Sequence, residues 1–381
     1  MKKYDVIILG AGAAGLKAAS ILRSRKKSVL IIDMGAKPAR KIEISGGGNC
    51  NFTNLNADYT HYFGKNPQFV RSALNQWTPT DTLNWVKSHN IKFIEKEPGR
   101  FFCANGTDDI INAMIHDIGT TEIKYNTNIT DVEKNDNIFI TKTNHGDFYS
   151  LSLIIATGGI SYPHLGVSNI GHIIAKKFGH KIEPIRPALC AIKTNAFNGG
   201  NLAGISTRVA IKNTQINDDL LFAHFGIGGP ATYRATVYLD SDITIDFVPG
   251  IDIFQLFKET KKSNGKKSVV GIIEKLVPNK LARFLCNNDT RNVADVRDSE
   301  LSSISNKIKN FTITDWSAVG MQSAEITFGG ISVDKISSKT MESKICNDLY
   351  FAGEVLDISG DLGGYNIQWA LSSGYTAGLN A

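Results

Sequence analysis

Three glycines near the start of the chain have the spacing that lets a backbone bind a diphosphate. Gly10, Gly12 and Gly15 follow the apolar run Val6–Leu9, which reads as a buried strand, and a segment typical of a helix comes next. The first glycine would allow a tight turn, the second an approach to a pyrophosphate, and the third close packing of helix on strand. The positive end of the helix would then face the phosphates.

An acidic residue follows the second apolar run at the spacing expected of a dinucleotide site. Asp33 comes directly after Val29–Ile32, about twenty residues beyond the glycines. A carboxylate in this position accepts hydrogen bonds from the ribose of the adenosine half. The strand, the turn, the helix and the acid together predict that the chain binds a dinucleotide.

Three further glycine-rich turns indicate that the ligand is long. They are Ser45–Asn51, Thr157–Gly159, and the pair formed by Gly353–Glu354 with Gly363–Gly364. Ligands of open α/β sheets lie beyond the carboxyl ends of the strands, so a ligand that touches all four turns must be extended. FAD fits this requirement better than a mononucleotide. The turn Gly363–Asn366 opens a helix whose N-terminus would favour the negative charge that a reduced flavin carries.

Composition limits the number of domains, the kinds of partner and the cellular compartment that can be expected. The 381 residues suggest two or three domains, and the net charge of +6 comes from scattered lysines and arginines, so no nucleic-acid partner is expected. The five cysteines are far apart and none forms a CxxC pair, which argues against a zinc site or a disulfide framework and fits the cytoplasm. No apolar stretch reaches about 18 residues, so no membrane span is expected, and the oligomeric state stays open.

The order of patterns predicts one domain interrupted by another. The chain starts β–α–β, continues through a long loop from Met34 to about Tyr62, and then alternates helical and strand-like segments. From Cys190 the pattern changes to short alternating strands, and flavin-type turns return after Ala324. We therefore expect an α/β Rossmann-like FAD domain formed by residues 1–189 and 323–381. Residues 190–322 form an inserted β-rich domain with a helical segment at about 268–286.

Several long motifs resemble one known family. They are Lys41–Asn54, Ala156–Pro163, Leu221–Gly226 with Gly229–Pro230, and Leu349–Asp357 followed by Gly363–Trp369. In this order they resemble the BaiN-type, aminoacetone-oxidase-like family of FAD-binding oxidoreductases over essentially the whole chain. The resemblance implies a two-dinucleotide-binding-domain flavoprotein fold, split by a barrel-like β insertion.

The resemblance also implies a set of FAD-binding residues. The pyrophosphate would meet Gly10, Gly12, Ala14 and Gly15, and the adenosine side would meet Asp33, Ile129, Thr157 and Gly158, while Arg40 and Lys41 would lie near the phosphates or the ribose. The ribitol and isoalloxazine would meet Ser45, Gly46, Glu354, Asn366 and Ile367, beside the turn glycines Gly353 and Gly364.

The expected activity is a hydride or electron-pair transfer between a small organic substrate and FAD, with O₂ or NAD(P)H as the other partner. A single complete glycine fingerprint argues against a tightly bound nicotinamide. No acid–base pair stands out: His224 and Tyr365 are weak catalytic candidates, and each fits a structural histidine or a packing aromatic as well. A non-catalytic FAD-binding redox sensor or assembly protein is the alternative, and a flavin enzyme acting on tRNA would need a continuous basic surface.

Overall fold

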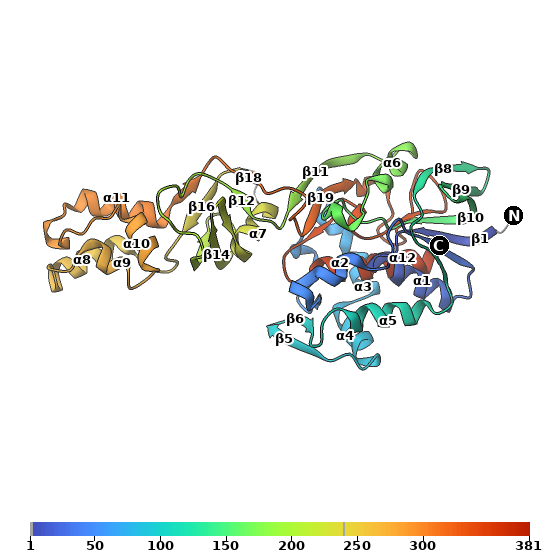
Figure 1. The fold of residues 1–381 in the computed structure, drawn as a ribbon, viewed down its shortest axis with the longest axis horizontal. Coiled ribbons are helices and arrows are strands. Elements are labelled where there is room, and N and C mark those ends of the chain that lie inside the picture. Colours follow the sequence, from blue (N-terminus) through green and yellow to red (C-terminus); the bar gives the residue numbers. More distant parts are fainter. Residues whose placement is uncertain (1–2, 239–240) are drawn as a thin grey trace. The chain divides into compact units, whose positions relative to one another are not determined.

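The computed structural model describes residues 3–238 and 241–381, and the chain divides into two compact units. Unit 1 comprises Met1–Pro187 and Ala324–Ala381, and unit 2 comprises Ala188–Ser323. Unit 1 is a Rossmann-like α/β fold and unit 2 is built on an antiparallel sheet (Figure 1). The predicted fold class, an α/β FAD domain with an inserted β-rich domain, is therefore confirmed.

The central strands of the unit 1 sheet, which precede the glycine-rich turns, are parallel to one another. Strands β2 (Val29–Ile32), β1 (Lys3–Leu9), β10 (Gly146–Ile155) and β20 (Leu349–Phe351) are neighbours in that order, and β7 (Glu122–Lys124) extends the β2 edge. On the other side β9 (Ile138–Thr143) pairs antiparallel with β10, and β8 (Ile129–Asn135) pairs with β9. The central strands are continuous apolar runs because helices cover both faces of a parallel sheet.

Two helices from opposite ends of the chain pack together in unit 1. Helix α1 (Ala13–Ser24) contacts α12 (Tyr365–Asn380), as Figure 1 shows. A side chain at Gly374 would collide with the backbone of Ala14, so the two helices can approach this closely only with a glycine there. This contact brings the late glycine turns next to the first one.

The long loop predicted from Met34 to about Tyr62 contains regular structure. It holds α2 (Arg40–Ile44), a 3-10 turn at Ser45–Gly48, and β3 (Asn51–Asn54), which pairs with β6 (Arg100–Cys103). A partner strand about fifty residues away orders this segment, which local sequence patterns do not reveal. The other elements of unit 1 are β4 (Tyr62–Phe63), α3 (Val70–Gln76), α4 (Pro79–Ser88), β5 (Phe93–Glu97), α5 (Asp108–Ile118), α6 (Ile170–Lys177), β11 (Ile182–Ala188), β19 (Ile326–Ile331) and β21 (Ser359–Gly360).

Unit 2 combines an antiparallel sheet with a helical part. The sheet has the order β17 (Phe311–Ile313), β16 (Ile243–Asp246), β13 (Ser206–Ile211), β14 (Asn217–Ala223), β15 (Gly226–Gly228), β12 (Ile192–Lys193) and β18 (Ser317–Ala318), with α7 (Gly229–Tyr238) against β14. The helices are α8 (Ile253–Ser263), α9 (Val269–Ile273), α10 (Asn279–Leu285) and α11 (Asp298–Lys309). Figure 1 shows them packed on one another beside the sheet.

The helical part is larger than the sequence analysis predicted. The expected helical segment at 268–286 is present as α9 and α10, with Pro278 ahead of the second helix. Helices α8 and α11 were not predicted. The spacing of Leu301, Ile304 and Ile308, all buried, is the amphipathic signal that could have identified α11. None of the described helices has the length and apolarity needed to cross a membrane.

Candidate functional site

The first glycine turn has a packed side and an open side. A side chain at Gly10 would collide with the backbone of Ala156, and one at Gly15 would collide with the carbonyl of Gly10. A side chain at Gly12 would instead enter open space, and Gly12 begins α1 without any side-chain cap. The first N–H groups of a helix have no partner inside that helix. An uncapped helix end with open space before it fits the diphosphate of FAD.

Asp33 lies at the end of β2 and faces this turn. Its Oδ2 accepts from the Ala11 N–H at 2.7 Å, and its Oδ1 accepts from the Gly35 N–H at 2.7 Å. The Arg40 guanidinium lies 3.2 Å from Oδ1, so Arg40 neutralises the carboxylate. Oδ1 accepts from two donors and Oδ2 from one, so Oδ2 retains further acceptor capacity, which fits the expected ribose contact.

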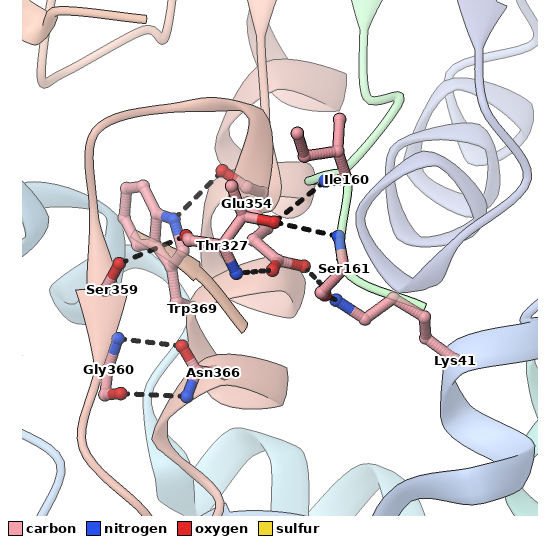
Figure 2. Close-up of polar contacts among 10 residues, drawn as sticks. Lys41, Ile160, Ser161, Thr327, Glu354, Ser359, Gly360, Asn366 and Trp369 are labelled. Carbon is pink, nitrogen blue, oxygen red and sulfur yellow. Dashed lines mark hydrogen bonds and ion pairs between the residues drawn. The ribbon is translucent and has the colours of Figure 1, made fainter. Parts of the chain in front are cut away.

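Lys41 and Glu354 join two distant segments of unit 1. The Lys41 Nζ lies 2.6 Å from Glu354 Oε2 and donates to the Ser161 hydroxyl at 2.8 Å (Figure 2). The other Glu354 oxygen, Oε1, accepts from the Thr327 N–H at 2.8 Å. Thr327 Oγ1 in turn accepts from the N–H groups of Ile160 and Ser161 at 2.8 and 3.0 Å. The network fixes the loop that follows β10 against α2, β19 and the Gly353 turn.

The Gly353 turn lies beside the first turn of α1. A side chain at Gly353 would come within 2.9 Å of Ala14 Cβ. The Trp369 indole donates to the Gly353 carbonyl at 3.2 Å, which ties the turn to α12 (Figure 2). Gly353, Glu354 and Ala14 are thus close together, as the prediction of a shared site requires.

Two predicted adenosine-side segments lie beside the ends of β1 and β2. Thr157 and Gly158 directly follow Ala156, whose backbone is packed against Gly10, and a side chain at Gly158 would enter open space. Ile129 begins β8, two residues after Thr127, whose N–H donates to the Asp33 carbonyl at 3.0 Å. Both segments are therefore within the neighbourhood of the fingerprint.

The Ser45–Asn51 segment and the start of α12 approach each other. Gly364 caps α12 with φ +92°, and a side chain there would come within 2.6 Å of the Thr53 carbonyl oxygen and 2.8 Å of Asn51 Oδ1. A side chain added at Gly364 would therefore meet protein backbone and not space open to a flavin ring. Ser45 lies in the neighbouring loop, where its hydroxyl donates to the Ile42 carbonyl at 2.7 Å, and the adjacent Gly46 is exposed.

Asn366 and Tyr365 have structural contacts in the first turn of α12. The Asn366 amide accepts from the Gly360 N–H at 2.7 Å and donates to the Gly360 carbonyl at 2.9 Å (Figure 2). Tyr365 is buried, and its ring stacks on His61 with centroids 4.7 Å apart. Ile367 is half-buried in the same turn. The contacts of Tyr365 favour the packing interpretation over a catalytic one.

His224, the other weak catalytic candidate, belongs to unit 2. It is exposed in the tight turn between β14 and β15. His224 makes none of the contacts described above for the candidate site in unit 1.

Glu325, a carboxyl group absent from the sequence predictions, lies near the Lys41–Glu354 network. Burial raises the pKa of Glu325, while a hydrogen bond to the Tyr162 side chain and the charge of Lys41 act in the opposite direction. Tyr162 has φ +55°, a left-handed conformation that is unusual for a bulky residue. The raised pKa and the position beside Lys41 and Glu354 make Glu325 a candidate acid. Its position directly after Ala324, where the flavin-type turns resume, was the available signal.

Comparison with known proteins identifies the family of the chain. The family model described as the HI0933-like protein Rossmann domain matches residues 4–380. A Haemophilus influenzae protein named ribosomal RNA dihydrouridine synthase is 36% identical over 398 residues, covering 100% of this chain and 99% of the relative. An Escherichia coli protein of the same name is 34% identical, covering 98% of this chain and 97% of the relative.

A more distant relative and one solved structure extend the comparison. The 3-dehydro-bile acid delta(4,6)-reductase of Clostridium scindens is 24% identical, with 98% of each chain covered. The structure of 3-ketosteroid-delta4-(5alpha)-dehydrogenase from Rhodococcus jostii RHA1 aligns with a TM-score of 0.50 and 10% identity, covering 100% of this chain and 96% of that one, and shows the fold alone. The chain belongs to the HI0933-like family of FAD-binding Rossmann proteins, which includes the BaiN-type enzymes, and it is a flavin-dependent oxidoreductase.

Proposed function

We propose that this protein reduces the C5–C6 double bond of a uridine in ribosomal RNA, with NAD(P)H as the source of electrons. The observation that carries the proposal is the identity of 36% and 34%, across almost the whole chain, to two relatives named for that reaction. The proposal departs from our expectation that the substrate is a small molecule and that no nucleic acid is bound.

The reaction adds one hydride and one proton to the uracil ring. FAD, when bound, would provide the hydride-transfer chemistry between NAD(P)H and the uracil ring. We assign the proton for C5 to the Glu325 carboxyl, which is hydrogen-bonded to the Tyr162 side chain near Lys41 and Glu354, and whose pKa burial raises. In the net reaction, uridine, NAD(P)H and one proton give dihydrouridine and NAD(P)⁺.

The polar network of unit 1 orients the cofactor and the acid together. Lys41 bridges Glu354 and Ser161, and its positive charge also lowers the pKa of Glu325. Asp33 and Arg40 lie at the ribose end, and the uncapped start of α1 receives the diphosphate. These residues would hold FAD, and the single glycine fingerprint predicts that NAD(P)H binds only transiently.

Lysines of unit 2 supply the charge that an RNA substrate requires. Between Lys261 and Lys280 the chain has six lysines and one glutamate, and Lys262, Lys266, Lys275 and Lys280 are exposed. The single acid, Glu274, is paired with Arg283 at 3.3 Å. The Lys275 ammonium lies close enough to Lys267 to lower the pKa of that residue. Ammonium groups gathered in this way attract phosphates, which supply most of the affinity for nucleic acids.

The test is an anaerobic reaction of the FAD-loaded protein with NADH or NADPH and ribosomal RNA. The RNA comes from cells that lack the gene, both as intact subunits and as protein-free RNA, and nucleosides are analysed by mass spectrometry. We expect dihydrouridine to form at one position. The proposal is wrong if no dihydrouridine forms while an unsaturated 3-oxo steroid reoxidises the flavin, because the enzyme would then act on small molecules.

A further inference from the structure

We propose a divalent transition-metal site formed by His89, His116 and Asp117, outside the residues assigned to the cofactor. His89 caps the C-terminus of α4, and the other two residues lie in the last turn of α5. One donor atom from each residue lies within 4.8 Å of the other two. The inference does not depend on the proposed function, because it uses different side chains and chemistry.

Both ring nitrogens of His89 have a polar partner, and one of the two partners, Asp117, is itself a possible metal ligand. The His89 Nδ1 lies 2.9 Å from the Trp85 carbonyl oxygen, which can only accept, so Nδ1 carries a proton. Its Nε2 lies 2.8 Å from Asp117 Oδ1, another acceptor. Two acceptors repel each other at this distance, so either Nε2 carries a proton or a metal ion binds both atoms. Histidines that bind metals usually donate the other ring N–H to a carbonyl, as His89 does.

Asp117 is held in the orientation that a metal ligand needs. Its Oδ2 accepts from the Trp85 indole N–H at 2.6 Å, and its backbone carbonyl accepts from Arg23 at 2.9 Å. These bonds leave Oδ1 directed at the two histidines, with His116 Nδ1 at 3.6 Å. Trp85 therefore orients both His89 and Asp117, through its carbonyl and its indole.

The donor set suits zinc better than calcium or magnesium. Two imidazoles and one carboxylate are typical Zn²⁺ ligands, whereas the alkaline-earth ions prefer oxygen alone. Bonds of about 2.0–2.1 Å in a tetrahedron place ligand atoms roughly 3.3 Å apart. The two separations around Oδ1, 2.8 and 3.6 Å, lie on either side of that value, and all three donor atoms lie within 4.8 Å of one another. The His116 side chain is 81% exposed, so its ring can turn onto the ion and water can occupy the fourth position.

Calorimetric titration of the untagged, FAD-loaded protein with ZnCl₂ at constant pH tests the proposal. We expect one Zn²⁺ per chain and a loss of at least tenfold in affinity for His116→Ala. Trp85→Phe keeps an aromatic side chain but removes the indole N–H that donates to Asp117, and it should weaken Zn²⁺ binding by roughly tenfold. His145→Ala is the matched control, because His145 is exposed in the turn between β9 and β10.

Two outcomes would overturn the site. One is the absence of stoichiometric Zn²⁺ binding by the wild-type protein. The other is an equal effect of His116→Ala and His145→Ala, which would mean that any surface histidine binds the ion. Flavin absorbance, recorded on every sample, shows that the variants are folded. A failed rRNA assay with intact zinc binding would refute the proposed function and leave the metal site standing.

Discussion

The Lys41 ammonium and the Glu354 carboxylate lie 2.6 Å apart although 313 residues separate them in the chain. The side chains are 29% and 20% exposed, so water screens the pair only in part. The same lysine donates to Ser161, and the same carboxylate accepts from the Thr327 backbone. The pair therefore links the two stretches of sequence that unit 2 separates.

The coupling between these two residues can be measured with the variants Lys41→Met, Glu354→Gln and the double variant. Each single change leaves a polar group unpaired, so we expect the double variant to bind FAD better than additivity predicts. A coupling energy of about 1 kcal/mol in the FAD dissociation constants is expected. Additive effects would show that the pair does not act as a unit in cofactor binding.

Asp33→Ala should weaken FAD binding by about 1–3 kcal/mol, a factor of roughly 5 to 150 in Kd. The substitution removes the expected ribose acceptor and leaves Arg40 without its counter-charge. Fluorescence titration of the apoprotein with FAD gives the affinity. Asp33→Asn is the control, because it keeps an acceptor for the Ala11 N–H. An unchanged Kd for Asp33→Ala would exclude the ribose role.

Glu325→Gln should lower the rate of substrate reduction by about 100-fold or more while the flavin content stays normal. In the wild-type enzyme, activity should fall as pH rises through the raised pKa of Glu325, because the acid must be protonated. The Tyr162 hydrogen bond lowers that pKa, so Tyr162→Phe should move the decline to higher pH. A pH profile that neither variant changes would assign the proton to another group.

The double variant Lys266→Glu with Lys275→Glu should bind ribosomal RNA at least tenfold more weakly. Loss of two phosphate contacts should also reduce the slope of log affinity against log salt by about two. Filter binding at several salt concentrations measures both quantities. The double variant Lys335→Glu with Lys339→Glu, at two exposed lysines of unit 1, is the control, because it makes the same change in net charge. An equal loss of RNA affinity in the test and control variants would mean that the RNA does not bind at Lys266 and Lys275.

Asp357→Asn should stabilise the protein above pH 6. Burial raises the pKa of Asp357 to about 6, and the side chain is 2% exposed. The folded state thus holds a proton that the unfolded state releases, and stability falls as pH rises from about 4 to 6. The amide removes this loss, so urea unfolding at pH 7–8 should show a gain of about 1–3 kcal/mol. At pH 4 the gain should vanish; a gain that is equal at both pH values would exclude ionisation as its cause.

The amino-acid sequence alone was sufficient for the fingerprint of Gly10, Gly12, Gly15 and Asp33, the FAD-binding class and the α/β fold with an inserted β-rich domain. These features depend on local patterns, since a strand, a turn and a helix start lie within a few residues of each other. Long, distinctive motifs such as Leu349–Asp357 identified the family for the same reason.

Only the tertiary structure revealed the contacts made between distant segments. The Lys41–Glu354 pair, the raised pKa of Glu325 and the cluster around Trp85 join residues from separate elements, and no local spacing encodes them. The collision that a side chain at Gly364 would make with Thr53 is of the same kind. Charge, burial and steric exclusion depend on neighbours in space, which the fold alone brings together.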